Sequence, residues 1–149
     1  MVKKGSNVKT VDDVAGKVVG AQLGTTGADY AKNKTKASSV RTYDLIDDAF
    51  NALEAGQVVA VINDCPVSKY AERAHKDLAV VQAIQTNEEY GFAFPKGSDS
   101  LRTAVNEQLA KLRDGGQLQK ISDKWLGKEP CSLHGSGSSN ASTAGGTKY

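Results

Sequence analysis

Two short polar segments follow apolar runs in this sequence, and their residue types are suited to binding a charged small molecule. The first segment, residues 22–27, joins the apolar run at residues 17–22 to a helical pattern that begins near Ala28. Its candidate binding residues are Gln22, Gly24, Thr25 and Thr26. Backbone N–H groups and hydroxyls at a helix N-terminus attract an anion. The alternative, a plain strand-to-helix turn capped by Thr26, is favoured on spacing alone.

The second segment follows the apolar run at residues 58–62 and contains Asn63, Asp64 and Cys65 before Pro66. An Asp at this place commonly caps the following helix, and on the residues alone capping is favoured over a ligand contact. If the two apolar runs lie near each other in a parallel sheet, both polar segments lie at its carboxyl edge, where ligands bind. One segment would then receive a carboxylate and Asp64 an ammonium group, which together match a zwitterion.

Residues suited to catalysis or metal binding are few. The histidines are His75 and His134, and neither has a Ser, Cys or acid placed to form a triad, so we expect both to be exposed to solvent. Cys65 and Cys131 are far apart and lack CxxC spacing, so we expect two unpaired thiols. The sequence therefore predicts no metal, no cofactor and no enzymatic activity.

Alternating strand and helix patterns must position these segments. The apolar runs that predict strands of a mostly parallel sheet are residues 17–22, 40–43, 58–62 and 78–84. The helical patterns between them are residues 28–34, residues 45–53 with Asp44 as the cap, and residues 66–74. This order predicts an α/β fold with right-handed crossovers.

The last third of the chain has a different pattern. Residues 90–94 alternate like a strand, and apolar residues at helical spacing then predict one helix over residues 101–112 and a short one around residues 118–125. Residues 131–149 are rich in Gly and Ser and carry a single formal charge, so we expect a flexible tail.

Composition bounds the classes of function. The 149 residues suit about one domain, and 39% hydrophobic with 24% charged residues is ordinary for a globular chain. A net charge of +2, spread along the chain, indicates no basic patch that would bind nucleic acid, so we predict no nucleic-acid partner. No apolar run approaches the roughly 18 residues that a membrane span needs, and the first residues lack a signal-peptide core. We therefore expect neither an anchor nor a signal peptide in this sequence.

Several segments, in their order, resemble the polar amino-acid-binding proteins of bacterial ABC importers. They are residues 16–20, 24–31, 43–53, 60–66, 90–97 and 118–127. The order and spacing match over roughly residues 1–129. The resemblance implies an α/β three-layer sandwich with a mostly parallel central sheet, a single lobe of the type 2 periplasmic-binding-protein fold.

The resemblance also implies a domain organisation and a set of ligand contacts. Residues 1–89 would be the second lobe, residues 90–130 the hinge strand and C-terminal helices, and residues 131–149 the tail. The first lobe of the family, with the Arg that grips the ligand carboxylate, has no counterpart here. The implied ligand contacts are Gln22, Gly24, Thr25, Thr26, Asn63 and Asp64, with Asp64 accepting from the α-ammonium. Loss of an Arg contact costs about 1.5 to 3 kcal/mol, so we expect an affinity for a free polar amino acid no better than about millimolar.

Three hypotheses of function follow. The first is a truncated amino-acid-binding protein, extracytoplasmic like its family, with the membrane subunits of an ABC importer as implied partners. The alternative is an interaction module, in which the C-terminal helices bind a partner or exchange with a second copy; we favour a swapped homodimer over helices that fold back. An enzyme related to dehydratases ranks third, since no acid and base pair can be named.

Overall fold

A three-stranded parallel sheet forms the centre of the fold, which a computed structural model describes for residues 1–86 and 89–126. Its strands are β2 (Val18–Gln22), β3 (Ser39–Tyr43) and β4 (Ala60–Val61), in the spatial order β3-β2-β4. In register, Val19 of β2 lies opposite Val40 on one side and Ala60 on the other. The predicted parallel strands at residues 17–22, 40–43 and 58–62 are confirmed, although β4 is shorter than the apolar run.

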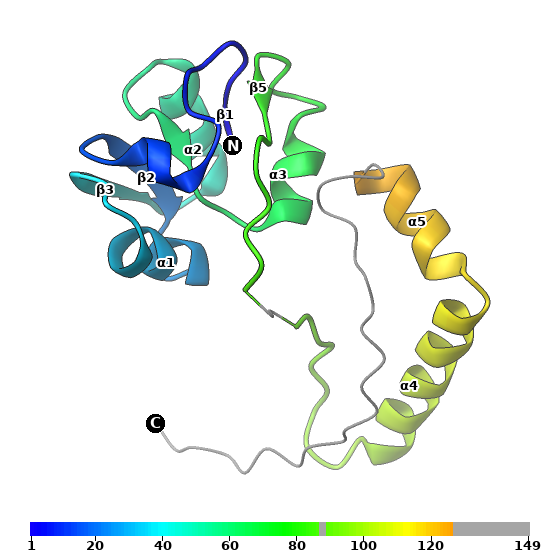
Figure 1. Ribbon diagram of the computed structural model, residues 1–149. Coiled ribbons are helices and arrows are strands. Elements are labelled where there is room, and N and C mark those ends of the chain that lie inside the picture. The colour runs from blue at the N-terminus through cyan, green and yellow to red at the C-terminus, as the bar shows by residue number, and fades with distance from the viewer. Residues whose placement is uncertain (87–88, 127–149) are drawn as a thin grey trace.

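Two helices cover opposite faces of this sheet (Figure 1). On one face, helix α1 (Thr26–Lys34) contributes Ala31 to an apolar cluster that also contains Val19 of β2. This cluster includes side chains of the N-terminal segment and of a short 3₁₀ helix, η1 (Val11–Val14). On the other face, α2 (Ile46–Glu54) contributes Phe50 and Leu53 to a second apolar cluster. Helix, sheet and helix make the α/β three-layer sandwich that the family resemblance implies.

A smaller two-stranded sheet lies beside β4 and corrects one prediction. Strand β1 (Val2–Lys3) pairs antiparallel with β5 (Leu78–Ala79). Of the strand predicted at residues 78–84, only these two residues of β5 form a strand. The Val80 N–H donates to Glu72 Oε1 at 2.7 Å instead of to a neighbouring strand, and Val81 is exposed. The Glu72 side chain thus accepts the N–H that would have continued the β-sheet hydrogen bonding, and the chain leaves the sheet after Ala79.

The first residue adds a polar group to the interior. The α-ammonium of Met1 donates to the carbonyl of Val61 at 2.8 Å, and the Val61 N–H donates back to the Met1 carbonyl at 2.9 Å. Burial lowers the pKa of this ammonium from 8.0 to about 6, although the charge of Glu72 acts in the opposite direction. The start of the chain therefore pairs with β4 and carries a group whose charge is costly to bury.

The remaining described helices follow from local signals. Helix α3 (Cys65–Ala71) has Pro66 in its first turn, as predicted. Helix α2 begins later than predicted: its cap residue is Leu45, not Asp44, and the cap has no side-chain hydrogen bond.

Among residues 1–86 and 89–126, no helix is both long and apolar enough to span a bilayer.

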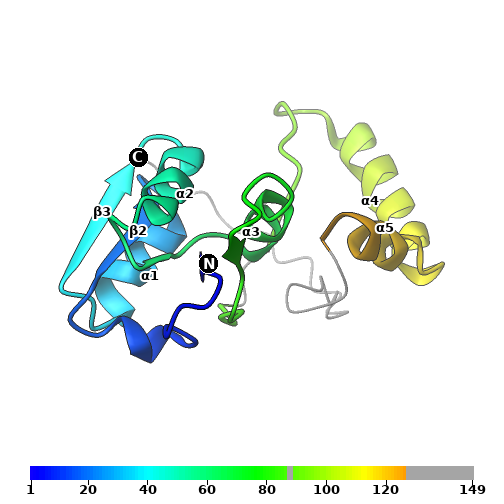
Figure 2. The same cartoon turned by 90° about the horizontal axis from the view of Figure 1, so that it is seen from above.

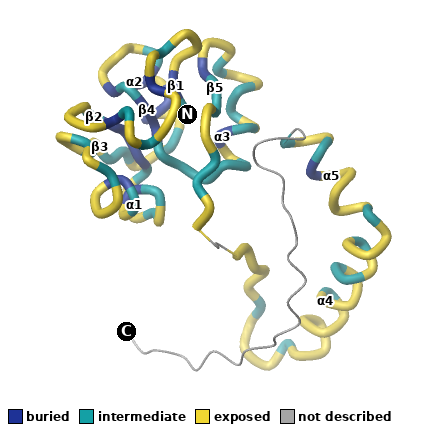
Figure 3. The backbone as a smooth tube through the Cα atoms, in the orientation of Figure 1, coloured by how far each residue is buried: buried dark blue, intermediate teal, exposed yellow. Residues whose placement is uncertain are grey.

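The C-terminal helices stand apart from the sandwich (Figure 1 and Figure 2). Residues 90–94, predicted as a strand, form no strand in the structure and are mostly exposed, and they lead to α4 (Asp99–Asp114) and α5 (Gln117–Leu126). No residue of α4 is buried (Figure 3). We call residues 1–79 the sandwich and α4 with α5 the arm.

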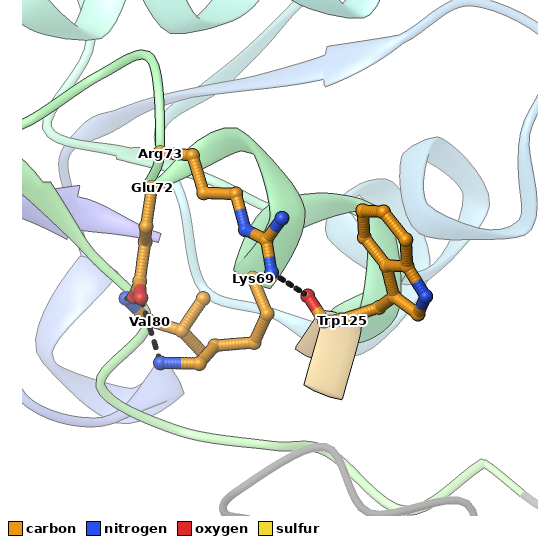
Figure 4. A network of polar contacts seen from close by, with 5 residues as sticks. All are labelled: Lys69, Glu72, Arg73, Val80 and Trp125. Carbon is orange, nitrogen blue, oxygen red and sulfur yellow. Dashed lines mark hydrogen bonds and ion pairs between the residues drawn. The ribbon is translucent and has the colours of Figure 1, made fainter. Parts of the chain in front are cut away.

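One side chain ties the arm to the sandwich. Arg73, just beyond α3, donates from Nη2 to the Lys124 carbonyl at 2.9 Å, near the end of α5. The same nitrogen donates to the Trp125 carbonyl at 3.1 Å (Figure 4). Its guanidinium also lies 5.3 Å from the Tyr70 ring centroid and 5.1 Å from that of Trp125. Cationic groups at a helix C-terminus are stabilising, so this contact holds α5 against α3 within one chain.

Candidate functional site

The two polar segments meet at the carboxyl edge of the parallel sheet. Strands β2 and β4 are neighbours, so the turn after β2 and the residues after β4 lie side by side. A Cβ placed on Gly27 would lie 3.0 Å from the Ile62 carbonyl oxygen and 3.4 Å from the Asn63 Cα. This close approach needs a glycine, and it brings the start of α1 against the segment before α3.

A groove of about 900 Å³ lies where these segments meet. It is lined by Thr26 and Gly27 from α1 and by Asn63 and Asp64 from the other segment. The first turn of α1 and Asp64 therefore line the same groove at the carboxyl edge of the sheet.

The other predicted contacts lie elsewhere. Among the residues that the structure describes, Gln22, Gly24 and Thr25 do not line the groove. The Gln22 side-chain amide donates to the Asp44 carbonyl at 3.1 Å, and Gly24 forms the turn with a φ of +73°. Thr25 is the cap of α1, because its hydroxyl accepts from the Ala28 N–H at 3.2 Å. The alternative that Thr26 caps this helix is wrong, and the exposed Thr26 side chain belongs to the groove instead.

Asp64 precedes α3 but does not cap it with its carboxylate. The structure gives the α3 N-terminus no side-chain cap hydrogen bond, whereas Asp64 Oδ2 accepts from the Tyr90 hydroxyl at 3.1 Å. Capping, the interpretation favoured by the residues alone, is therefore wrong for this side chain. Its neighbour Asn63 is half-buried and lines the groove, with its amide nitrogen enclosed and unbonded in the structure.

Tyr90 is a site residue that the sequence did not suggest. It lies 26 residues after Asp64, in a stretch whose pattern indicates only a strand, and it lines the same groove. An aromatic residue at the start of an alternating run carries no local signal for contact with a distant carboxylate. Only the path of the chain brings the two together.

Two expectations about reactive side chains are overturned. His75 is not solvent-exposed: Nδ1 lies 3.0 Å from Glu54 Oε1, and the ring packs edge-on against Phe50 with centroids 5.4 Å apart. Cys65 is disulfide-bonded, not a free thiol, and the other cysteine, Cys131, lies outside the described residues, as does His134. Within residues 1–86 and 89–126, no three His, Cys, Asp or Glu side chains group as metal ligands.

Comparison with known proteins places this fold in a class. The chain is 33% identical over 132 residues to the L-cystine-binding protein TcyJ of Escherichia coli (strain K12), covering 87% of this chain and 50% of that protein. It is 30% identical over 131 residues to the ABC transporter glutamine-binding protein GlnH of Bacillus subtilis (strain 168), covering 87% of this chain and 48% of the relative.

A solved structure gives the same result in three dimensions. Substrate-binding domain 2 of GlnP from Lactococcus lactis, in its open conformation, superposes with a TM-score of 0.69 at 32% identity, covering 87% of this chain and 57% of that one. The fold is therefore a single lobe of the type 2 periplasmic-binding-protein class.

The family model of the bacterial extracellular solute-binding proteins, family 3, matches residues 1–128, and the chain belongs to that family. This confirms the resemblance to the amino-acid-binding proteins of ABC importers. The chain spans about half the length of the curated relatives that it matches.

Proposed function

We propose that this chain is the second half of an extracytoplasmic amino-acid receptor of an ABC importer, and that it binds a free polar amino acid weakly. In this proposal residues 1–89 form the second lobe, residues 90–130 the hinge strand and C-terminal helices, and residues 131–149 a tail. The observation that supports the proposal is a groove lined both by the start of α1 and by Asp64, whose carboxylate makes no capping bond to its own helix.

The charges around the groove suit the ammonium end of an amino acid. Its charged side chains are Asp29, Lys34, Asp64 and Glu89, of which three are acidic. Clefts lined mostly by one sign of charge concentrate ligand groups of the other sign. The carboxylate end would then be received by Thr26 and the first-turn N–H groups of α1, since a helix N-terminus attracts an anion.

The proposed affinity for this sequence alone is low, because it spans about half the length of the relatives that it matches. Among the described residues no arginine lines the groove, and a charge-assisted contact of that kind is worth about 1.5 to 3 kcal/mol. We expect dissociation constants of about a millimolar or weaker.

The test is an NMR titration of the whole chain with each of the twenty amino acids. We expect shifts in Thr26, Gly27, Asn63 and Asp64 and their absence with an N-acetylated ligand, which has no ammonium group. Asp64→Asn should weaken binding about tenfold. Asp44→Asn is the matched control, because Asp44 also follows a parallel strand and precedes a helix. Binding that is equal in wild type and Asp64→Asn would overturn the assignment.

A second candidate function is self-association through the arm. Apolar side chains remain exposed on both arm helices, and Arg73 could hold the α5 of a second copy as it holds its own. Exchange of the arm would give a symmetric swapped dimer with the same contact between chains. Light scattering at micromolar concentration tests it: twice 15.7 kDa supports the dimer, and a monodisperse species near 15.7 kDa contradicts it.

The remaining partners follow from the family. If the chain retains the receptor role, the membrane subunits of an ABC importer are its macromolecular partners, and its place is outside the cytoplasm. A catalytic role is not proposed. His75, the one described histidine, is engaged by Glu54 and packs on Phe50, away from the residues that line the groove.

A further inference from the structure

One hydrogen bond joins the proposed half-site to the segment that returns from the sandwich. The Tyr90 hydroxyl donates to Asp64 Oδ2 at 3.1 Å, and both residues line the groove. Asp64 stands at the end of the segment after β4, whereas Tyr90 lies in the exposed stretch that leads toward the arm. The contact therefore links two parts of the chain that share no strand pairing.

The donor's chemistry suits the task of holding a ligand-binding carboxylate. An ionised carboxylate offers about four acceptor sites on two oxygens, so one phenolic O–H on Oδ2 leaves Oδ1 open to an ammonium group. The phenol is neutral and leaves the negative charge in place. Within residues 1–86 and 89–126, no Lys or Arg forms an ion pair with Asp64 that would cancel this charge.

Fixing the carboxylate before the ligand arrives also lowers the cost of binding. A side chain that must be ordered on association loses rotamer freedom, and that loss weakens binding. The capping bond that usually orders an Asp before a helix is missing here. The hydroxyl of Tyr90 supplies the constraint instead.

We propose that Tyr90 is a positioning residue of the amino-acid site, whose hydroxyl orients the Asp64 carboxylate toward the ligand ammonium. The proposal rests on the proposed function and deepens it. It also predicts that ligand binding at Asp64 changes the environment of Tyr90, and so that of the segment that leads to the arm.

The decisive variant is Tyr90→Phe, which keeps the ring and removes only the hydroxyl. The probes are L-glutamine and L-arginine with their N-acetyl forms, titrated by NMR into the full chain. We expect Tyr90→Phe to weaken binding of the free amino acids about threefold to tenfold. Tyr70→Phe, an exposed tyrosine on α3 that keeps its ring over Arg73, is the matched control and should bind as wild type.

Two further measurements separate a positioning role from a structural one. The Tyr90→Phe penalty should vanish in an Asp64→Asn background, because the hydroxyl acts through that carboxylate. In the ligand-free protein, Asp64→Asn should shift the Tyr90 ring resonances, and this holds whether or not a ligand binds.

The outcomes distinguish this proposal from the one on which it rests. If Tyr90→Phe binds as tightly as wild type or tighter while Asp64→Asn binds weakly, the role of Tyr90 is wrong and the proposed function stands. If Asp64→Asn has no effect either, or if wild type binds none of the twenty amino acids, both proposals are overturned.

Discussion

The sandwich and the arm differ in how they use their apolar side chains. In the sandwich, Phe50, Leu53 and Val61 are at most 1% exposed and pack in one cluster. In the arm, Leu101 is 52% and Trp125 is 45% exposed, and α4 has no buried residue. The same kind of helical periodicity thus leads to a core in one region and to an open surface in the other.

The difference shows what a periodic pattern establishes. A helix with an apolar stripe predicts that the stripe is buried, but the pattern does not say which chain provides the cover. In α2 the cover comes from neighbouring strands of the same sandwich. In the arm, the described contacts with the sandwich are concentrated at Arg73 and the end of α5. The sandwich is therefore expected to determine stability, and the arm to determine association.

The largest effect should come from opening the core of the sandwich. Phe50→Ala removes a fully buried ring that packs against His75, and we expect a loss of about 3 to 5 kcal/mol in the free energy of unfolding. Leu101→Ala on α4 is the matched control and should change it by less than about 0.5 kcal/mol. Urea unfolding of both variants measures this. A large loss for Leu101→Ala would mean that the arm is covered, as in a dimer.

The next effect concerns the buried α-ammonium, in a chain whose first residue is Met1. Because its pKa falls from 8.0 to about 6 on folding, the unfolded chain binds more protons between these values. Stability should be greatest above pH 8 and should decline as the pH falls to 6, by up to about 3 kcal/mol. The same chain acetylated at Met1 serves as the control. An equal pH dependence in both would show that the ammonium is not buried.

The sequence predicted the sandwich well because its signals are local and consistent. Short, β-branched apolar runs such as residues 17–22, alternating with helical patterns, are typical of strands buried on both faces of a parallel sheet. The run at residues 78–84 misled because Glu72 takes the Val80 N–H, and no local pattern reveals that contact. A strand needs a partner as well as apolar residues, and residues 90–94 have none among the described residues.

The candidate site was predictable only in part. Two adjacent parallel strands had to bring Thr26 and Asp64 together, so their convergence followed from the fold. Which of Thr25 and Thr26 caps α1 could not be predicted, because either hydroxyl can cap a helix and the choice depends on the residue at which the helix begins. The role of His75 also depended on a contact with Glu54, 21 residues earlier.

A smaller effect should come from releasing the arm. Arg73→Lys keeps the charge, but an ammonium cannot reproduce the planar fork that bonds two carbonyls and stacks on Trp125. We expect a local loss of about 1 kcal/mol, seen as roughly fivefold faster amide exchange in α5. Arg102→Lys on the exposed face of α4 is the control and should leave α5 exchange unchanged. Unchanged exchange in Arg73→Lys would show that other contacts hold α5.

The smallest effect should appear at the edge of the sandwich, in the turn before η1. The Asp13 carboxylate accepts from the Lys9 N–H at 2.9 Å and from the Thr10 N–H at 2.8 Å. These backbone hydrogen bonds, with one from the Thr10 hydroxyl, lower the pKa of Asp13 below its ordinary value of 3.8. The stabilisation is complete above that value and is lost as the pH falls through the folded-state pKa.

Asp13→Asn should therefore flatten the acid side of the stability curve of the sandwich. The free energy of unfolding between pH 5 and pH 3 measures this, with Asp12→Asn as the neighbouring control. Because the turn lies in the sandwich, the exchange rates of α5 should not respond to the substitution. A change in α5 exchange would mean that the edge of the sandwich and the arm are coupled. It would contradict the expectation that the sandwich alone determines stability and the arm determines association.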